Sequence, residues 1–194
     1  GTFGHVIISS MAAYTLSKRR FYGSRFIFNM IVLSLMFSAA VTGIPLFMIM
    51  SGLHMVNTYW SIILPAFCSS LGLYLMKQFM ETSVPDVIIE AAKIDGAKEM
   101  RIFWVIAMPM VKPAWLTLIV FSFQSLWNAN GGIYIQSEEL KTLNYAVSQI
   151  ILGGIARAGV GAAAMVFMMI LPILVFVFTQ SNIVETMSSS GIKE

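Results

Sequence analysis

Five long apolar segments constrain the fold of this chain more than any other feature. The first is short, while the other four are each long enough to cross the hydrocarbon core of a membrane, which takes about 20 residues; the segments cover residues 1–16, 26–50, 60–80, 110–128 and 160–180. A backbone in lipid must satisfy its own hydrogen bonds, so segments of this length are expected to be helices. The sequence therefore predicts an all-α, polytopic transmembrane helical bundle forming a single domain over residues 1–194.

Composition supports a membrane protein independently. The chain is 58% hydrophobic and only 11% charged, whereas soluble domains carry about 25% charged residues. Cys68 is the only cysteine, and His5 and His54 stand alone in the sequence, so no disulfide and no metal site is expected, and both histidines are expected to be incidental. The net charge of +3 does not indicate nucleic-acid binding, because the positions of the basic residues around the segments matter more than their sum.

The polar stretch over residues 82–115 differs from everything around it. Ser83, Pro85 and Asp86 predict a helix start, because a hydroxyl can cap, a proline loses no needed N–H and an acid suits the positive helix end. Asp95-Gly96 predicts the end of that helix, since glycine adopts the left-handed turn freely. A second short helix is expected from Ala97 to about Trp104. The mixed charges place this compact knob in water.

The order of residues in this stretch resembles the EAA loop of the membrane subunits of binding-protein-dependent type I ABC importers. The matching residues are Glu90, Ala91, Ala92, Asp95, Gly96, Ala97, Phe103, Ile106, Pro109 and Pro113, with Met108 where the pattern usually has leucine. The form with Asp-Gly-Ala is similar to the carbohydrate-uptake branch, the maltose-type permeases, and the resemblance extends over residues 11–193. It implies that residues 82–109 form a coupling loop that docks on the ATPase subunit, with Glu90, Ala91, Ala92, Asp95, Gly96, Ala97, Phe103 and Pro109 as the coupling residues.

The basic residues predict the orientation of the bundle. Ten of the twelve lysines and arginines fall on one side: Lys18, Arg19, Arg20, Arg25, Lys77, Lys93, Lys98, Arg101, Lys112 and Lys193; the other two are Lys141 and Arg157. Basic loops favour the cytoplasmic side. The coupling loop and the C-terminus are therefore expected in the cytoplasm, and the resemblance implies that the membrane is the plasma (inner) membrane of a prokaryote.

The loop over residues 129–158 is expected on the outside. Connections of 30 residues are usually functional or disordered, and the apolar residues of 143–152 indicate a short packed helix within it. The resemblance implies that this loop reaches the extracytoplasmic solute-binding protein. The alternative is a re-entrant helix that only caps the bundle.

A polar stripe follows the fourth segment. Ser122, Ser125 and Asn128 recur every three residues, so they share one helix face. They are candidates for the translocation path, because hydroxyls and amides suit sugar hydroxyls, or for polar contacts between helices. Trp127 could likewise stack on a sugar or lie in the interfacial aromatic belt.

Two absences narrow the function. No Asp or Glu lies inside a predicted span, which argues against an ion-coupled transporter, and no GxxxxGK[ST] loop is present to bind ATP. The resemblance implies a sugar or oligosaccharide permease, not an enzyme, that works with an ATP-binding subunit dimer, a second permease subunit, a solute-binding protein and membrane lipid. ATP-Mg would be bound by the partner, and the chain itself would need no cofactor. The alternatives are import of a peptide, amino acid or polyamine, or a non-transporting assembly protein; a further N-terminal span is also expected to be missing from the chain.

Overall fold

The computed structural model describes residues 1–19, 21–153 and 158–190, and the side chains of 39 and 181–190 are outside that description. The described part consists of helices and contains no strand, which confirms the all-α prediction. Arg20, Arg157 and Lys193, the end of the 129–158 loop and the C-terminal residues all fall outside the described residues, so the orientation inferred from them stays a prediction.

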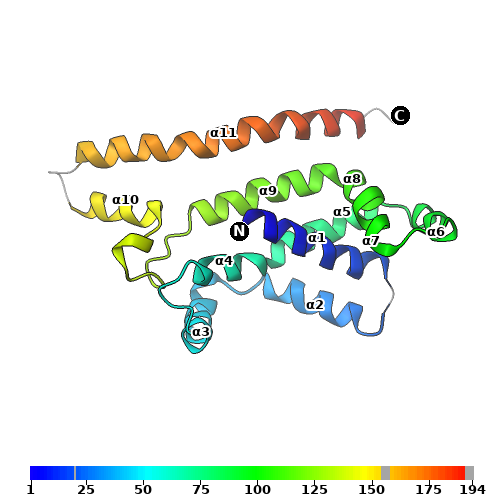
Figure 1. Ribbon diagram of the computed structural model, residues 1–194, viewed down its shortest axis with the longest axis horizontal. Helices are drawn as coiled ribbons and strands as arrows, with labels where there is room; N and C mark the ends of the chain where they lie inside the picture. Colours follow the sequence, from blue (N-terminus) through cyan, green and yellow to red (C-terminus); the bar gives the residue numbers. More distant parts are fainter. Residues whose placement is uncertain (20, 154–157, 191–194) are drawn as a thin grey trace.

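The helices form an elongated bundle (Figure 1). At its centre, α1 (Thr2–Lys18) packs against α5 (Ser70–Ser83) and α9 (Lys112–Trp127), and α4 (Trp60–Phe67) contacts both α1 and α9. The long α11 (Ala158–Ser190) runs beside α9. The coupling loop, with α6 (Asp86–Ile94) and α7 (Glu99–Arg101), lies at one end, and α10 (Leu143–Leu152) lies at the other.

The expectation of one continuous helix over residues 26–50 is wrong. The segment contains α2 (Ser24–Ser34) and α3 (Ala39–Gly52), separated by a turn. The N–H groups of Leu35, Met36 and Phe37 each bond to the carbonyl three residues earlier, and Ser38 is extended. These tight bonds end α2, and each piece is shorter than the roughly 20 residues that a crossing needs. Apolar composition alone carries no signal for such a break.

Two other helices have the expected length. The 24-residue unit Trp60–Ser83 and Ala158–Gln180, with 23 residues, are long and apolar enough to cross a membrane. A third crossing is possible if Glu99–Met110 and Lys112–Trp127 count as one span, bent by 83°. Within the described residues, length and composition thus support two or three crossings. The number of about five membrane spans remains a prediction from the sequence.

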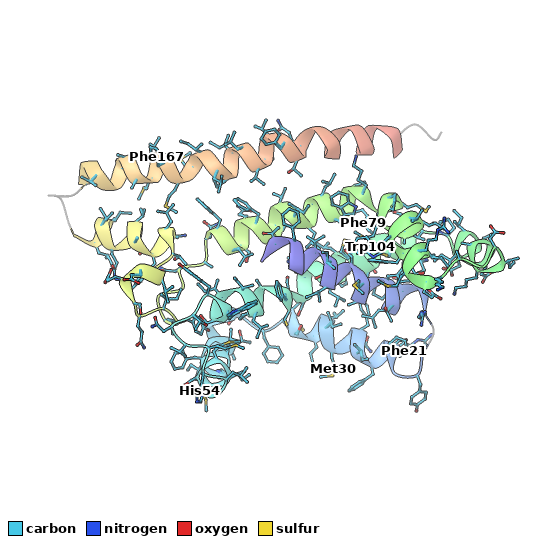
Figure 2. All side chains as sticks on the ribbon, viewed as in Figure 1. Phe21, Met30, His54, Phe79, Trp104 and Phe167 are labelled. Atoms are coloured by element: carbon cyan, nitrogen blue, oxygen red, sulfur yellow. The ribbon has the colours of Figure 1, made fainter. Side chains whose placement is uncertain are left out.

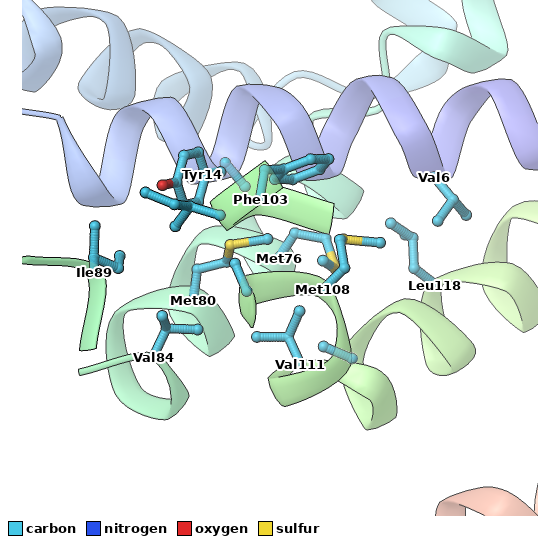
Figure 3. Close-up of a cluster of buried hydrophobic side chains, with 14 of the residues drawn as sticks. Val6, Tyr14, Met76, Met80, Val84, Ile89, Phe103, Met108, Val111 and Leu118 are labelled. Atoms are coloured by element: carbon cyan, nitrogen blue, oxygen red, sulfur yellow. The ribbon is translucent and has the colours of Figure 1, made fainter. Parts of the chain in front are cut away.

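The buried core lies between α1, α5, residues 84–108 of the predicted coupling loop and the first half of α9 (Figure 3). Met76 and Met80 of α5 are fully buried, and they pack with Phe103 and Val111. Elsewhere, large apolar side chains point outward, among them Met30, Phe79 and Phe167 (Figure 2). Phe167, on α11, is 79% exposed. A surface of this kind suits lipid or a partner subunit and would be unfavourable in water.

Candidate functional site

The first helix of the coupling loop ends as the sequence predicts. The Gly96 N–H bonds to the Lys93 carbonyl at 3.0 Å, and the Ala97 N–H bonds to the Ala92 carbonyl at 2.9 Å. This pair of bonds is the Schellman motif, and it needs a left-handed residue at Gly96, whose φ is +78°. A Cβ at Gly96 would meet nothing within 4 Å. Glycine is therefore favoured at this position by its backbone conformation, and not because a larger side chain would clash with a neighbour.

The start of the same helix differs from the prediction. Ser83 is the last residue of α5, Pro85 is the N-cap residue of α6, and no side chain caps that end. Asp86 lies in the first turn, where its charge suits the helix dipole. The predicted Ser83 cap is wrong because α5 continues one turn further than the polar residues suggest.

The second helix of the loop is longer than expected. It begins at Glu99, not Ala97, and continues beyond Trp104 through the π-helix η1 (Ile102–Ala107) to α8 (Met108–Met110). Pro109 follows the widened turn, and its missing N–H and bulky ring disfavour ordinary α-helical bonding there. The chain then bends by 83° into α9. The predicted coupling loop is thereby joined to the apolar helix α9 through one sharp bend.

The predicted coupling residues divide into an exposed and a buried set. Glu90, Ala91, Asp95, Gly96 and Pro109 are exposed, and Ala97 is half-buried. Ala92 is only 8% exposed and Phe103 is buried, and both belong to the core cluster. The Phe103 ring lies edge-on to Tyr14 at 5.4 Å. Ala92 and Phe103 therefore hold the loop on the bundle from inside, while the exposed set is free to meet a partner.

Two residues of this surface escaped the sequence analysis. Val87 is 74% exposed and Ile94 is 86% exposed. With Glu90 and Ala91 they occupy positions i, i+3, i+4 and i+7 of α6, which lie on one helix face. We call Val87, Glu90, Ala91 and Ile94 the α6 face. The same spacing, read from the sequence, could have identified it.

A network of ion pairs and one hydrogen bond connects the helices at the coupling-loop end of the molecule. One oxygen of the Glu99 carboxylate lies 3.1 Å from Arg19 and 3.3 Å from Lys93, and the other accepts a hydrogen bond from the Tyr14 hydroxyl at 3.2 Å. Lys18 pairs with Asp86 at 2.8 Å. These contacts join the end of α1 to both α6 and α7.

The network also sets the ionisation of Glu99. Burial by itself raises the pKa of the Glu99 carboxyl, but the hydrogen bond and charge of Lys93 and the charge of Arg19 outweigh it. The pKa of Glu99 is therefore lowered from its ordinary value. The carboxylate is held in its charged form, which is the form that keeps α1 and α6 together.

The polar stripe on α9 is split between two cavities. Ser122 and Ser125 line a cavity of about 220 Å³ that His5 also lines. Asn128 instead lines a cavity of about 510 Å³ with Trp127 and residues of α10 and α11. The three residues that the sequence places on one stripe therefore do not line one cavity, and their role in a translocation path stays a prediction. His5, expected to be incidental, is 3% exposed and faces the first cavity.

Comparison with known proteins assigns the family. Residues 5–189 match the family described as "Binding-protein-dependent transport system inner membrane component". The arabinooligosaccharides transport system permease protein AraQ of Bacillus subtilis is 27% identical over 190 residues, covering 97% of this chain and 67% of AraQ. The sn-glycerol-3-phosphate transport system permease protein UgpE of Yersinia enterocolitica is 35% identical over 127 residues, covering 66% of this chain and 45% of UgpE.

The fold agrees with that assignment. A chain in the crystal structure of a bacterial ABC transporter involved in the import of the acidic polysaccharide alginate matches with a TM-score of 0.71 and 25% identity, over 99% of this chain and 71% of that one. Protein LplC of Bacillus subtilis, 34% identical over 128 residues, is covered over 42% of its length. This chain thus spans between about two fifths and two thirds of the curated relatives cited. It belongs to the family of inner-membrane components of binding-protein-dependent transport systems.

Proposed function

We propose that this chain is the membrane-spanning permease subunit of an ATP-driven importer that takes up a sugar or oligosaccharide. Family membership supports a transport role, and the names of AraQ and of the melibiose/raffinose/stachyose import permease MelC of Bacillus subtilis support the solute class. The observation that carries the proposal is the α6 face, an apolar and acidic surface presented at one end of the bundle.

The partners follow from this role. An ATP-binding subunit dimer docks on the coupling loop in the cytoplasm, a second permease subunit completes the pathway, and a solute-binding protein on the outer side delivers the solute near α10. The chain lies in the inner membrane of a prokaryote, in contact with lipid. Hydrolysis of ATP-Mg belongs to the partner, and this subunit is a transporter component and not an enzyme.

Each element of the coupling loop has a mechanical part. Val87, Ala91 and Ile94 bury apolar surface in the groove of the ATPase, and Glu90 pairs with a basic residue there. Gly96, with Asp95 and Ala97, holds the turn that gives α6 its direction. The dimer draws the loops together when it binds ATP, and that displacement passes to the bundle through buried Ala92 and Phe103 and through the bend at Val111.

The pathway for the solute runs beside α9. Ser122, Ser125 and Asn128 offer hydroxyl and amide groups at the level of the two cavities. Alternating access follows when the movement of the coupling loop turns α9 relative to α1 and α11, since both of these helices pack on it.

Cysteine crosslinking tests the docking step. In the complete transporter, Cys68 is first replaced by alanine, and single cysteines are placed at Ile94 and, as a matched control on the same helix, at buried Ala92. We expect a disulfide from position 94 to a cysteine in the ATPase groove, with a yield that changes with ATP, and none from position 92. No crosslink from position 94 in either nucleotide state would refute the role of the α6 face.

The solute class has its own test. The solute-binding protein that works with this subunit should bind a neutral sugar or oligosaccharide when screened by thermal shift against sugars, peptides, amino acids, polyamines and glycerol phosphates. Stabilisation only by a non-sugar solute would keep the importer and replace the proposed solute class.

A further inference from the structure

The cavity of about 220 Å³ beside α9 contains buried polar groups that other contacts do not explain. It lies between α1, the junction of α4 with α5, and α9. Its polar lining comes from His5, Ser69, Ser122 and Ser125, and the rest of the wall is apolar. The Ser69 hydroxyl is engaged, since it accepts a hydrogen bond from the Gly72 N–H.

Within the described part of the chain, two of these groups have no hydrogen-bond partner. His5 Nε2 and Ser122 Oγ are buried and unpaired, and their residues are 3% and 4% exposed. Ser10, also on α1 and fully buried, donates instead to the Val6 carbonyl at 2.6 Å. A helical serine can thus satisfy itself on its own backbone, as Ser10 does. An unpaired buried polar atom is costly and calls for an explanation.

The packing makes room for the histidine at this position. A Cβ at Gly72 would lie 2.4 Å from His5 Nε2 and 2.8 Å from a methyl group of Leu118. Only a glycine leaves the imidazole its place between α1 and α5. The cavity, the glycine and the two unpaired atoms together describe a built polar site inside the bundle.

The chemistry of the lining selects a class of ligand. A neutral imidazole nitrogen and a serine hydroxyl can each donate or accept a hydrogen bond, according to tautomer and rotamer, which suits sugar hydroxyls. None of the described residues that line the cavity is Asp, Glu, Lys or Arg, so an anionic group would be desolvated here without a countercharge from them. The volume corresponds to about seven waters at ~30 Å³ each, which is room for one sugar ring and not for an oligosaccharide.

We propose that His5, Ser122 and Ser125 form a subsite that holds one neutral sugar ring during passage across the membrane. This inference rests on the proposed function and sharpens it. The subsite favours neutral saccharides over acidic ones, in contrast to the alginate importer that the fold resembles. Asn128, in the neighbouring cavity, is not part of it.

The test uses the complete transporter in lipid nanodiscs, without binding protein or nucleotide. Saturation-transfer NMR measures binding of methyl α-D-glucopyranoside as the neutral probe and glucuronate as the acidic one. Ser122→Ala and His5→Leu should each weaken binding of the neutral probe about three- to tenfold, the effect of losing one hydrogen bond. Ser10→Ala, the matched control outside the cavity, should bind it as the unmodified protein does, and glucuronate should give no signal.

Thermal unfolding supplies a second and independent readout. Because the Ser122 hydroxyl is unpaired, Ser122→Ala should leave the melting temperature unchanged or raise it, whereas Ser10→Ala should lower it. Undiminished probe binding in both cavity variants would mean that the groups hold only water, and would overturn the proposal. Absence of neutral-probe binding to the unmodified transporter would overturn it as well. If either of these two results were found while position 94 still crosslinks to the ATPase, the subsite alone would be refuted and the proposed function would remain supported.

Discussion

Replacing Glu99 by glutamine should loosen α6 from the bundle. The variant removes a charge that lies 3.1 Å from Arg19 and 3.3 Å from Lys93, yet its amide oxygen can still accept the Tyr14 hydroxyl. The Glu99 side chain is 36% exposed, so solvent screens both pairs and surface values apply. Each pair then contributes about 0.2–1 kcal/mol, or about 0.4–2 kcal/mol together.

Hydrogen–deuterium exchange of the complete transporter measures this loss. Local opening of residues 86–97 should become about two- to thirtyfold more frequent, the factor that corresponds to 0.4–2 kcal/mol. Glu138→Gln removes a comparable ion pair, with Lys141, at the other end of the molecule. It is the matched control and should leave exchange of residues 86–97 unchanged.

The same experiment has a definite pH dependence. The pKa of Glu99 is lowered in the folded protein from an ordinary value of 4.5. A group with a lowered folded pKa stabilises fully above its unfolded pKa, and that stabilisation is lost as the pH falls through the folded pKa. The excess exchange of the variant should thus be constant above pH 4.5 and vanish progressively below it. Equal exchange at neutral pH, or an increase spread evenly over α9 and α11, would show that the network does not hold α6.

Three further substitutions test the structure. Gly96→Val should strain the turn by about 1–3 kcal/mol, because the φ of Gly96 is +78°, and it should therefore reduce uptake. Asparagine tolerates that backbone region, so Gly96→Asn should retain most uptake. Equal uptake by both variants would contradict the backbone argument. Met76→Ala should lower the free energy of unfolding by about 2–5 kcal/mol, because Met76 is fully buried. A loss well under about 1 kcal/mol in chemical denaturation would count against tight packing around Met76. Gly72→Ala should lower the melting temperature by forcing its Cβ onto His5, while Gly43→Ala, with nothing within 4 Å, should not; similar melting temperatures for the two would argue against the close approach of α1 and α5.

Predictions from sequence succeeded where the determinant was local. The end of α6 follows from Asp95-Gly96 alone, because few residues other than glycine adopt a positive φ freely. The bounds of α10 follow from the apolar run over residues 143–152, and Thr142 caps its start by accepting the Tyr145 N–H. Each of these features depends on neighbours within a few positions.

Predictions failed where the determinant was a distant contact. The α2–α3 break interrupts a segment of uniform apolar character, and hydropathy averages over it. Nothing in the sequence indicated that Ala92, one of the predicted coupling residues, packs inside its own subunit. Ser122 and Asn128 were expected to share a helix face, but they line different cavities, because residues of α1, α4 and α5 enclose one cavity and residues of α10 and α11 enclose the other.

The sequence by itself determined the class of protein, the composition of its membrane segments and the turn at Gly96, because apolar length, charge content and a left-handed glycine act locally and add along the chain. Tertiary structure alone decided the rest. It brought Tyr14, Arg19, Lys93 and Glu99 into one network and set His5 opposite Ser122 in one cavity. His5 and Ser122 lie near opposite ends of the first two thirds of the chain, and only the packing of α1 against α5 and α9 brings such distant residues within reach of one another.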